Sequence, residues 1–208
     1  MIENKKILIL GMARSGVSVA KLLAEYNNNI LITDMKEQES TVLKELHNLN
    51  IEVVIKENQE ELLDESYDLV VKNPAIRKDN LAVLKAKSLN IPIINEVEVA
   101  YKFLPSDVTI IGITGSNGKT TTTTITYELL KTTGRNVFLG GNIGIPLSSI
   151  VKEIKSGDLL VLEISDHQLC DMYDFKTNIS AITNLSEVHL DFHGSYEEYK
   201  RMKKRIFN

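Results

Sequence analysis

The chain has 208 residues, a formal net charge of −4 and 25% charged residues, which is typical of a globular protein. This charge gives no general attraction to nucleic acid, and we interpret the one strongly basic run, residues 200–205, as a solvated helix face. The single cysteine, Cys170, excludes an internal disulfide and fits a reducing compartment. No apolar run approaches the roughly 20 residues that a membrane-spanning helix needs. We therefore expect a cytoplasmic protein without a membrane span or a nucleic-acid partner.

Short apolar runs rich in β-branched residues alternate with helical segments along the chain. The runs predicted as strands are KILIL, NILIT, DLVV, IPII, VTIIGIT, NVFLG, DLLVLEIS and NISAITN. The segments predicted as helices are 15–26, 39–48, 80–88, 119–133 and 196–207. This order is typical of an α/β fold with parallel sheets. A helix ending near Pro105 marks the best boundary, so we predict two nucleotide-binding folds, residues 1–104 and residues 105–208.

The first half opens with a strand, a tight turn and a helix, the context of a dinucleotide-binding fingerprint. The pattern is Gly11-x-Ala13-x-x-Gly16, with alanine where the fingerprint has its second glycine. Asp34 ends the second predicted strand, where an acidic side chain could bind a ribose hydroxyl. Three interpretations stay open: a structural turn, a nucleotide or sugar-nucleotide site, and an NAD site.

The second half contains a phosphate-binding loop between a strand and a helix. A strict loop of this kind would have glycine at position 113, where the chain has Ile113. The functional end of the motif is present: Lys119 would reach the β- and γ-phosphates, Thr120 would bind Mg²⁺ and Thr121 could donate to a phosphate oxygen. Backbone amides at the helix start would cradle the phosphates. The loop itself comprises Gly115, Ser116, Asn117 and Gly118. The alternative is a glycine turn without a ligand.

Polar residues after later strands extend this site. Glu163 ends a predicted strand, where α/β sheets place their ligands, and a carboxylate there suits Mg²⁺. His189 and Asp191 follow another strand, and Asn142 lies in the glycine-rich turn GGNIGIP. Each could instead be a solvated or structural side chain.

Five segments together carry a resemblance to a known family. In chain order they are ILGMARSGVSVAKLL, GITGSNGKTT, GGNIGIP, LEISDHQL and ITNLSEVHLDFHGSYEEYKRMKKRIF. Over essentially the whole chain the sequence resembles the Mur ligases, and within them the members that add D-glutamate to UDP-N-acetylmuramoyl-L-alanine during peptidoglycan synthesis. The resemblance implies a Rossmann-like, UDP-sugar-binding domain over residues 1–104, and part of a P-loop-type central ATPase domain over residues 105–208. It also implies ATP and Mg²⁺ as cofactors, an acyl-phosphate intermediate and, for the full-length enzyme, a monomer.

The resemblance also implies roles for individual residues. Lys119, Glu163, His189 and Lys203 match catalytic positions, and Thr120, Glu163, His189 and Lys203 would hold metal ions. Lys203 matches a lysine that is carbamylated in the family, with Lys204 as the alternative if the helix register differs. The positions facing the UDP-sugar would be Arg14, Ser15, Asp34, Met35, Lys36, Asn142, Ser165 and Gln168.

The chain departs from the family pattern in three ways. Asn73-Pro74-Ala75 has alanine where glycine is usual, and ISDHQL replaces the usual LSSFQL, which places Asp166 and His167 beside the site. Family members have three domains, whereas this chain ends at Asn208 inside the second, so we expect a fragment that is inactive alone. Alternatives are another Mur-type ligase, a non-catalytic nucleotide-binding module and an NAD-dependent oxidoreductase.

Overall fold

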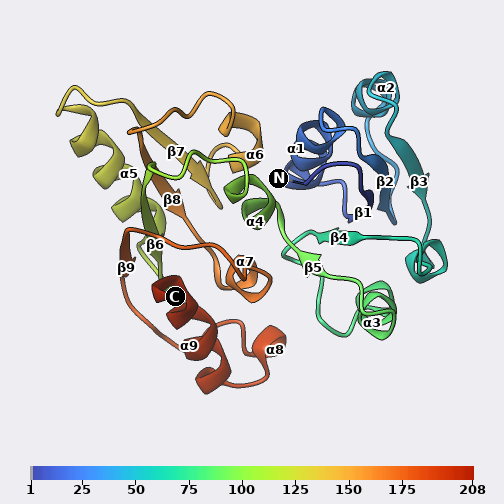
Figure 1. Ribbon diagram of the computed structural model, residues 1–208. Helices are drawn as coiled ribbons and strands as arrows, with labels where there is room; N and C mark the ends of the chain where they lie inside the picture. The colour runs from blue at the N-terminus through green and yellow to red at the C-terminus, as the bar shows by residue number, and fades with distance from the viewer. Residues whose placement is uncertain (1) are drawn as a thin grey trace. The chain divides into compact units, whose positions relative to one another are not determined.

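The computed structural model describes residues 2–208, which form two compact units (Figure 1). The first unit ends at Lys102 and the second begins at Phe103. Each unit is a parallel sheet with helices packed against it, so the predicted α/β class is confirmed. Among the described residues, no helix has both the length and the apolar character needed to cross a membrane.

The first unit contains a five-stranded parallel sheet of order β3-β2-β1-β4-β5. This is the nucleotide-binding arrangement in which successive strands are added first on one side of β1 and then, from β4 on, on its other side. The strands are β1 (Lys6–Leu10), β2 (Asn29–Asp34), β3 (Glu52–Ile55), β4 (Leu69–Lys72) and β5 (Ile93–Ile94). The helices are α1 (Arg14–Ala24), α2 (Ser40–Asn48), the 3₁₀ helix η1 (Gln59–Leu62), α3 (Leu81–Ser88) and α4 (Glu96–Tyr101).

The core of the first unit explains why β1 and β4 are continuous apolar runs. Leu8 and Leu10 of β1 belong to a buried cluster with Val70 of β4 and with Ala82 and Val83 of α3. Neighbouring residues of β1 point to the opposite face and are also buried. A strand covered on both faces has no polar side, as in other parallel sheets.

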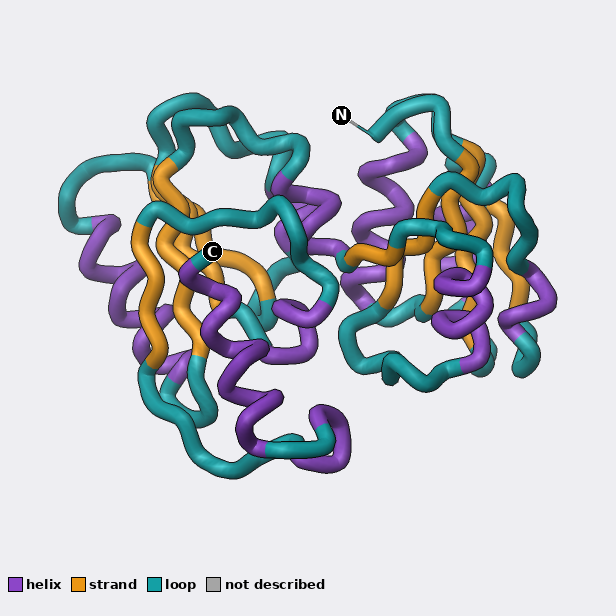
Figure 2. Tube along the Cα trace, turned by 60° about the horizontal axis from the view of Figure 1, so that its bottom comes forward, coloured by secondary structure: helices purple, strands orange, loops and turns teal. Residues whose placement is uncertain are grey.

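The second unit contains a four-stranded parallel sheet of order β7-β8-β6-β9. Figure 2 shows strands lying side by side with helices packed against them. The strands of this unit are β6 (Thr109–Thr114), β7 (Val137–Gly141), β8 (Leu159–Glu163) and β9 (Ile179–Ile182). Its helices are α5 (Lys119–Lys131), α6 (Leu147–Ile150), α7 (Asp166–Cys170), α8 (Leu190–His193), α9 (Tyr196–Lys204) and the 3₁₀ helix η2 (Arg205–Phe207).

Helices cover both faces of the second sheet. Ile111 and Ile113 of β6 pack against Tyr127 and Leu130 of α5. Gly112 faces the other side, where an added Cβ would meet η2 residue Ile206 at 3.3 Å. Because all four strands are parallel, the loops after β6, β7, β8 and β9 meet at one edge of the sheet.

The predicted strands and helices are all present, and the elements that were not predicted are short. The five predicted helices exist with ends shifted by a few residues, and residues 205–207 form η2 rather than α-helix. We did not predict β3, a four-residue edge strand that is only half-buried. Helices α6, α7 and α8 have four or five residues, which is too short for an apolar periodicity to appear.

Candidate functional site

In the first unit, the turn between β1 and α1 is tightly packed. Gly11 has φ +96°, and a Cβ on Gly16 would lie 2.0 Å from the Gly11 carbonyl oxygen. The Asp34 carboxylate ties this turn to the end of β2, because it accepts hydrogen bonds from the amides of Met12 (2.7 Å) and Lys36 (3.1 Å). Asp34 therefore positions backbone at the carboxyl edge of the sheet, where α/β folds bind ligands.

The other residues predicted to face a UDP-sugar lie at this same edge. Arg14 and Ser15 form the first turn of α1, where backbone amides and the helix dipole favour an anion. Met35 and Lys36 are exposed just after β2. Asn73 packs against the turn, since a Cβ on Gly11 would meet the Asn73 Cβ at 2.9 Å.

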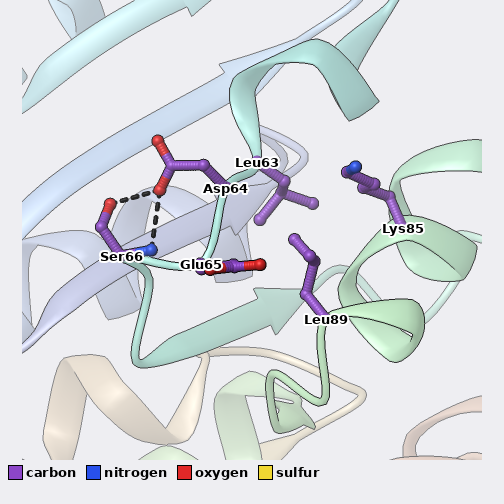
Figure 3. Close-up of a pocket in the computed structure, with 6 residues that line it drawn as sticks. All are labelled: Leu63, Asp64, Glu65, Ser66, Lys85 and Leu89. Atoms are coloured by element: carbon purple, nitrogen blue, oxygen red, sulfur yellow. Dashed lines mark hydrogen bonds between the residues drawn. The ribbon is translucent and has the colours of Figure 1, made fainter.

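A separate pocket of about 420 Å³ lies at the opposite edge of this sheet, before β4 (Figure 3). Its lining residues are Leu63, Asp64, Glu65, Ser66, Lys85 and Leu89. The amino edge of a parallel sheet is not where α/β folds place their ligands, so this pocket is not the candidate site.

In the second unit, the predicted phosphate loop joins β6 to α5 and ends in a left-handed glycine. Gly118 has φ +75° and is the N-cap of α5, so the first amides of the helix face the loop. Gly115 has φ +148°, and a Cβ there would lie 2.0 Å from the Thr183 Oγ1 atom. Only glycine fits at position 115 without displacing the neighbouring loop.

The loop after β9 holds the phosphate loop in shape. The Ser116 amide donates to the Asn184 carbonyl (2.9 Å), and the Asn117 amide donates to the Asn184 Oδ1 atom (3.0 Å). The Thr183 hydroxyl donates to the Asn117 carbonyl (2.6 Å). These bonds fix the loop backbone before any ligand arrives.

The side chains predicted to act on phosphate and metal converge at the start of α5. The Thr120 hydroxyl donates to the Glu163 Oε2 atom (2.7 Å), and the Asn142 amide group donates to Oε1 (2.8 Å). Glu163 is 1% exposed. The Lys119 Nζ atom donates to the Ser116 carbonyl (3.0 Å), which curls the side chain back over the loop. A hydroxyl beside a carboxylate is an oxygen donor pair that suits Mg²⁺.

The remaining hydroxyls of the threonine run have different surroundings. Thr121 is exposed in the first turn of α5, where its hydroxyl is accessible to a ligand. Thr123 is fully buried, as expected for a residue that packs the helix onto the sheet.

Ser165 and Gln168 form the capping box of α7. The Ser165 amide donates to Gln168 Oε1 (2.8 Å), and the Gln168 amide donates to Ser165 Oγ (3.2 Å). Both side chains thereby fix the first turn of α7. The first residue of that turn is Asp166.

Asp166 is the centre of a buried group of charged and imidazole side chains. Its Oδ2 atom lies 2.7 Å from His193 Nε2 and 3.0 Å from His189 Nδ1, and its Oδ1 atom lies 3.3 Å from Lys203 Nζ. Burial by itself raises the pKa of the Asp166 carboxyl, but the His193 hydrogen bond and the Lys203 charge outweigh it and hold the pKa well below its usual range. Asp166 is therefore an anion.

His189 reaches this group through an unusual backbone conformation. Its φ is +54°, in the left-handed region, where it caps the short helix α8. Non-glycine residues in this region cluster at functional sites. The His189 side chain is half-exposed, so it connects the buried Asp166 to solvent.

Lys203 is fully buried and points at the beginning of the phosphate loop. Its Nζ atom donates to Thr114 Oγ1 (2.9 Å) and to the Gly115 carbonyl (3.0 Å), in addition to its contact with Asp166. Burial lowers the pKa of Lys203 to about 8, against the opposing effect of Asp166. Lys204, in contrast, is exposed. The prediction that residues 200–205 form a solvated helix face is therefore wrong for Lys203, which is buried, although Lys204 is exposed.

Sequence reasoning missed two members of the site. His193 was not singled out, although it is 5% exposed and contacts Asp166 directly. Tyr199 is fully buried, and its hydroxyl lies 2.7 Å from the Ser116 Oγ atom. The available signal was helical spacing, because Tyr199 and Lys203 lie four residues apart on one face of α9.

Fold and site together define an α/β nucleotide-binding protein with a phosphate loop. Comparison with known families specifies the class further. The family described as "Mur ligase MurD-like, N-terminal domain" matches residues 5–95, and "Mur ligase middle domain" matches residues 113–208. The chain belongs to the Mur ligase family, as the motifs predicted.

Curated relatives with a high identity are named UDP-N-acetylmuramoylalanine--D-glutamate ligase. The protein of Streptococcus sanguinis is 47% identical over 204 residues, which are 98% of this chain and 45% of the relative. That of Geobacillus kaustophilus is 43% identical over 206 residues, 99% of this chain and 45% of the relative. The chain thus spans a little under half the length of these relatives.

Two solved structures share the fold at low identity. UDP-N-acetylmuramate-alanine ligase of Thermotoga maritima has a TM-score of 0.57 at 24% identity, covering 98% of this chain and 47% of that one. The UDP-N-acetylmuramate:L-alanyl-gamma-D-glutamyl-meso-diaminopimelate ligase of Neisseria meningitidis has a TM-score of 0.57 at 17% identity, covering 98% and 68%.

Proposed function

We propose that this chain supplies the UDP-sugar-binding and ATP-binding units of a cytoplasmic ligase that adds D-glutamate to UDP-N-acetylmuramoyl-L-alanine. The observation that carries the proposal is the meeting of Lys119, Thr120 and Glu163 at the start of α5. It is supported by the names of relatives 43–47% identical over almost the whole chain. In this reaction the L-alanyl carboxylate takes the γ-phosphoryl group of ATP, and the amine of D-glutamate then displaces phosphate.

Under this proposal the second unit binds ATP and Mg²⁺. The amides of the loop 115–118 and of the first turn of α5 contact the phosphates, and Lys119 neutralises charge on the phosphoryl group that is transferred. Thr120 and Glu163 would hold Mg²⁺ through their oxygen atoms, and Thr121 would donate to a phosphate oxygen. The work of these residues is positioning and charge neutralisation.

The first unit, residues 1–104 in our proposed division, binds the UDP part of the donor. Asp34 fixes the turn after β1, and the first turn of α1 presents amides to the diphosphate. Arg14 adds a positive charge, while Ser15, Met35 and Lys36 line the same edge. We propose that Asn142, Ser165 and Gln168 of the second unit face the sugar-peptide end.

We also propose that His189 and Lys203 contribute to binding metal near the phosphoryl group. An ammonium beside Mg²⁺ would repel it, whereas a carbamylated lysine carries a negative charge. Lys203 suits this modification because burial lowers its pKa to about 8, which increases the fraction of neutral amine. Lys204 is exposed and lacks this environment.

The proposal is tested by extending the chain at Asn208 with the remaining part of the Streptococcus sanguinis relative and measuring product by mass spectrometry. The added part would supply the site for D-glutamate. The choice of UDP-sugar in the reaction therefore depends on this chain. We expect D-glutamate-dependent product from UDP-N-acetylmuramoyl-L-alanine, and none from UDP-N-acetylmuramate, which lacks the alanine. A folded hybrid that binds ATP but prefers the shorter donor, or forms no product, would contradict the proposal.

A further inference from the structure

Asn117 and Gly118 form an asparagine–glycine pair within the phosphate loop. No other asparagine of the sequence is followed by glycine. Asn117 is exposed, and its backbone amide and carbonyl are the only parts of it that make hydrogen bonds with residues 2–208. The carboxamide of Asn117 is therefore free to turn toward the peptide bond that follows it.

The peptide nitrogen of Gly118 is unhindered. Within the part of the chain that the structure describes, its N–H group makes no hydrogen bond that would have to break before a reaction. Gly118 has no side chain, and a Cβ built there would meet no atom within 4 Å. This nitrogen and the Asn117 carboxamide carbon belong to neighbouring residues, so their reaction is intramolecular and closes a five-membered ring.

Two features of the fold favour loss of the Gly118 amide proton, which makes the nitrogen a nucleophile. The Asn117 carbonyl oxygen accepts hydrogen bonds from Thr183 Oγ1 (2.6 Å) and from Asn184 Nδ2 (2.9 Å). A deprotonated peptide shares its negative charge with this oxygen, so both bonds stabilise the anion. Gly118 is also the N-cap of α5, whose dipole places positive charge at this end of the helix.

We propose that Asn117 is a site of spontaneous deamidation through a cyclic succinimide with Gly118. The Gly118 nitrogen gives its proton to water and forms a bond to Asn117 Cγ. The carbon–nitrogen bond of the carboxamide then breaks, and its nitrogen takes a proton and leaves as ammonia. Water opens the ring at Cγ to give aspartate, or at the Asn117 backbone carbonyl to give isoaspartate. The net reaction consumes one water and releases one ammonia.

Both products change the phosphate loop in the same direction. Each places a carboxylate in residues 115–118, and isoaspartate also lengthens the backbone by one methylene, which displaces the amides of the loop. A loop altered in this way repels phosphate, so deamidated chains should lose affinity for ATP. The loss of ATP affinity rests on the proposed function, whereas the modification itself does not.

Peptide mapping by mass spectrometry tests the proposal on the folded chain, incubated at mildly alkaline pH without nucleotide. We expect conversion of Asn117 to a mixture of aspartate and isoaspartate. Asn142 is the control in the same digest, because it also lies in a glycine-rich turn but precedes Ile143 and donates to Glu163 Oε1 (2.8 Å). Asn142 should stay intact. Asn117→Gln should stop the reaction at position 117, since glutamine would have to close a larger ring.

A matched pair of substitutions tests the contribution of the fold. Thr183→Val removes the hydroxyl and keeps the shape, whereas Thr183→Ser keeps the hydroxyl. Deamidation should be about fivefold slower in Thr183→Val than in Thr183→Ser, which corresponds to the roughly 1 kcal/mol that one hydrogen bond contributes. Circular dichroism checks that both variants fold. If Thr183→Val does not fold, the map of the wild-type chain decides alone.

Two results would overturn the proposal. One is an intact Asn117 in the folded chain after a time in which a synthetic peptide of residues 112–124 is converted. The other is a rate in folded Thr183→Val that equals or exceeds the rate in Thr183→Ser, because the contacts of the Asn117 carbonyl would then not assist the reaction. The map is recorded without ATP, so its outcome does not depend on whether the loop binds a nucleotide.

Discussion

The Thr120 hydroxyl and the Glu163 carboxylate are joined by a 2.7 Å hydrogen bond, although 43 residues separate them in the chain. The bond links the first turn of α5 to the end of β8, and Asn142, from the turn after β7, binds the other carboxylate oxygen. The segments after β6 and after β7 therefore meet on one buried side chain at the end of β8. The parallel register of β6 with β8 creates this meeting, since Ile113 pairs with Glu163.

The first prediction concerns Lys119. Lys119→Ala removes the ammonium that the phosphate loop would present to ATP, and a charged hydrogen bond is worth about 1.5–3 kcal/mol. We expect Mg-ATP affinity, measured by calorimetry, to fall roughly 10- to 100-fold with an unchanged melting temperature. The control, Lys131→Ala, removes a half-exposed lysine at the other end of α5. Equal ATP affinity in both variants would show that the loop does not bind phosphate.

The second prediction concerns Gly115. A Cβ in Gly115→Ala would lie 2.0 Å from Thr183 Oγ1, so the loop after β9 must move. We expect the free energy of unfolding in urea to fall by at least about 2 kcal/mol, since strain and a close contact add.

Gly134→Ala is the matched control for this change. Gly134 also has a positive φ, +76°, but an added Cβ meets no atom within 4 Å. Gly134→Ala should lower the free energy of unfolding by about 1 kcal/mol, because only the left-handed backbone conformation disfavours alanine there. If both substitutions destabilised the chain equally, the contact with Thr183 would not be what requires glycine.

The third prediction concerns pH. Burial lowers the pKa of Lys203 from 10.5 to about 8. Below pH 8 this lysine is charged in both the folded and the unfolded state, and the cost of burying the charge is fully present. Between pH 8 and 10.5 Lys203 holds its proton more often in the unfolded state than in the folded state, so its contribution to the free energy of unfolding rises with pH.

Comparison with Lys203→Met isolates this contribution. We expect the unfolding free energy of the native chain, relative to that of the variant, to increase as the pH is raised through 8 toward 10.5. Urea titrations at successive pH values measure this difference. A difference that stays flat or decreases with pH would contradict a buried Lys203 with a lowered pKa.

The fourth prediction concerns carbamylation. In buffer containing ¹³C-bicarbonate, the neutral Lys203 amine should attack CO₂ and release a proton, giving a ¹³C carbamate signal in the NMR spectrum. Lys203→Arg should lose that signal, while Lys204→Arg, a change at an exposed neighbour, should keep it. The opposite pattern would assign the modification to Lys204.

Local rules predicted the parts of the site that lie directly at strand ends. Lys119, Thr120 and Glu163 each lie at the carboxyl edge of a predicted strand or at the start of the helix after it, and parallel strands bring such edges together. The same rule predicted Asp34 at the end of the second strand, and the structure shows that its carboxylate binds the turn after β1. Chain spacing is enough in these cases because a strand fixes the direction in which the next segment of the chain leaves the sheet.

The group around Asp166 could not be predicted in the same way. Asp166, His193 and Lys203 lie on three helices, and two of these helices have only four or five residues. No periodicity reveals helices this short, and their packing depends on tertiary contacts rather than on local sequence. The charges of residues 200–205 indicate a solvated helix face. The burial of Lys203 depends on the packing of α9 against the rest of the unit, which the local sequence does not reveal.

The most direct test of the central claim is a titration of this chain with UDP-N-acetylmuramoyl-L-alanine, monitored by calorimetry. A sugar-nucleotide-binding first unit predicts weak, saturable binding that UDP competes away and that NADH does not affect. The exposed Arg14, replaced by Ala, should weaken the binding, whereas Lys44→Ala on α2 should not. A folded chain that shows no saturable binding of the UDP-sugar, or that binds NADH in its place, would contradict the assignment of this protein to donor binding in a D-glutamate ligase.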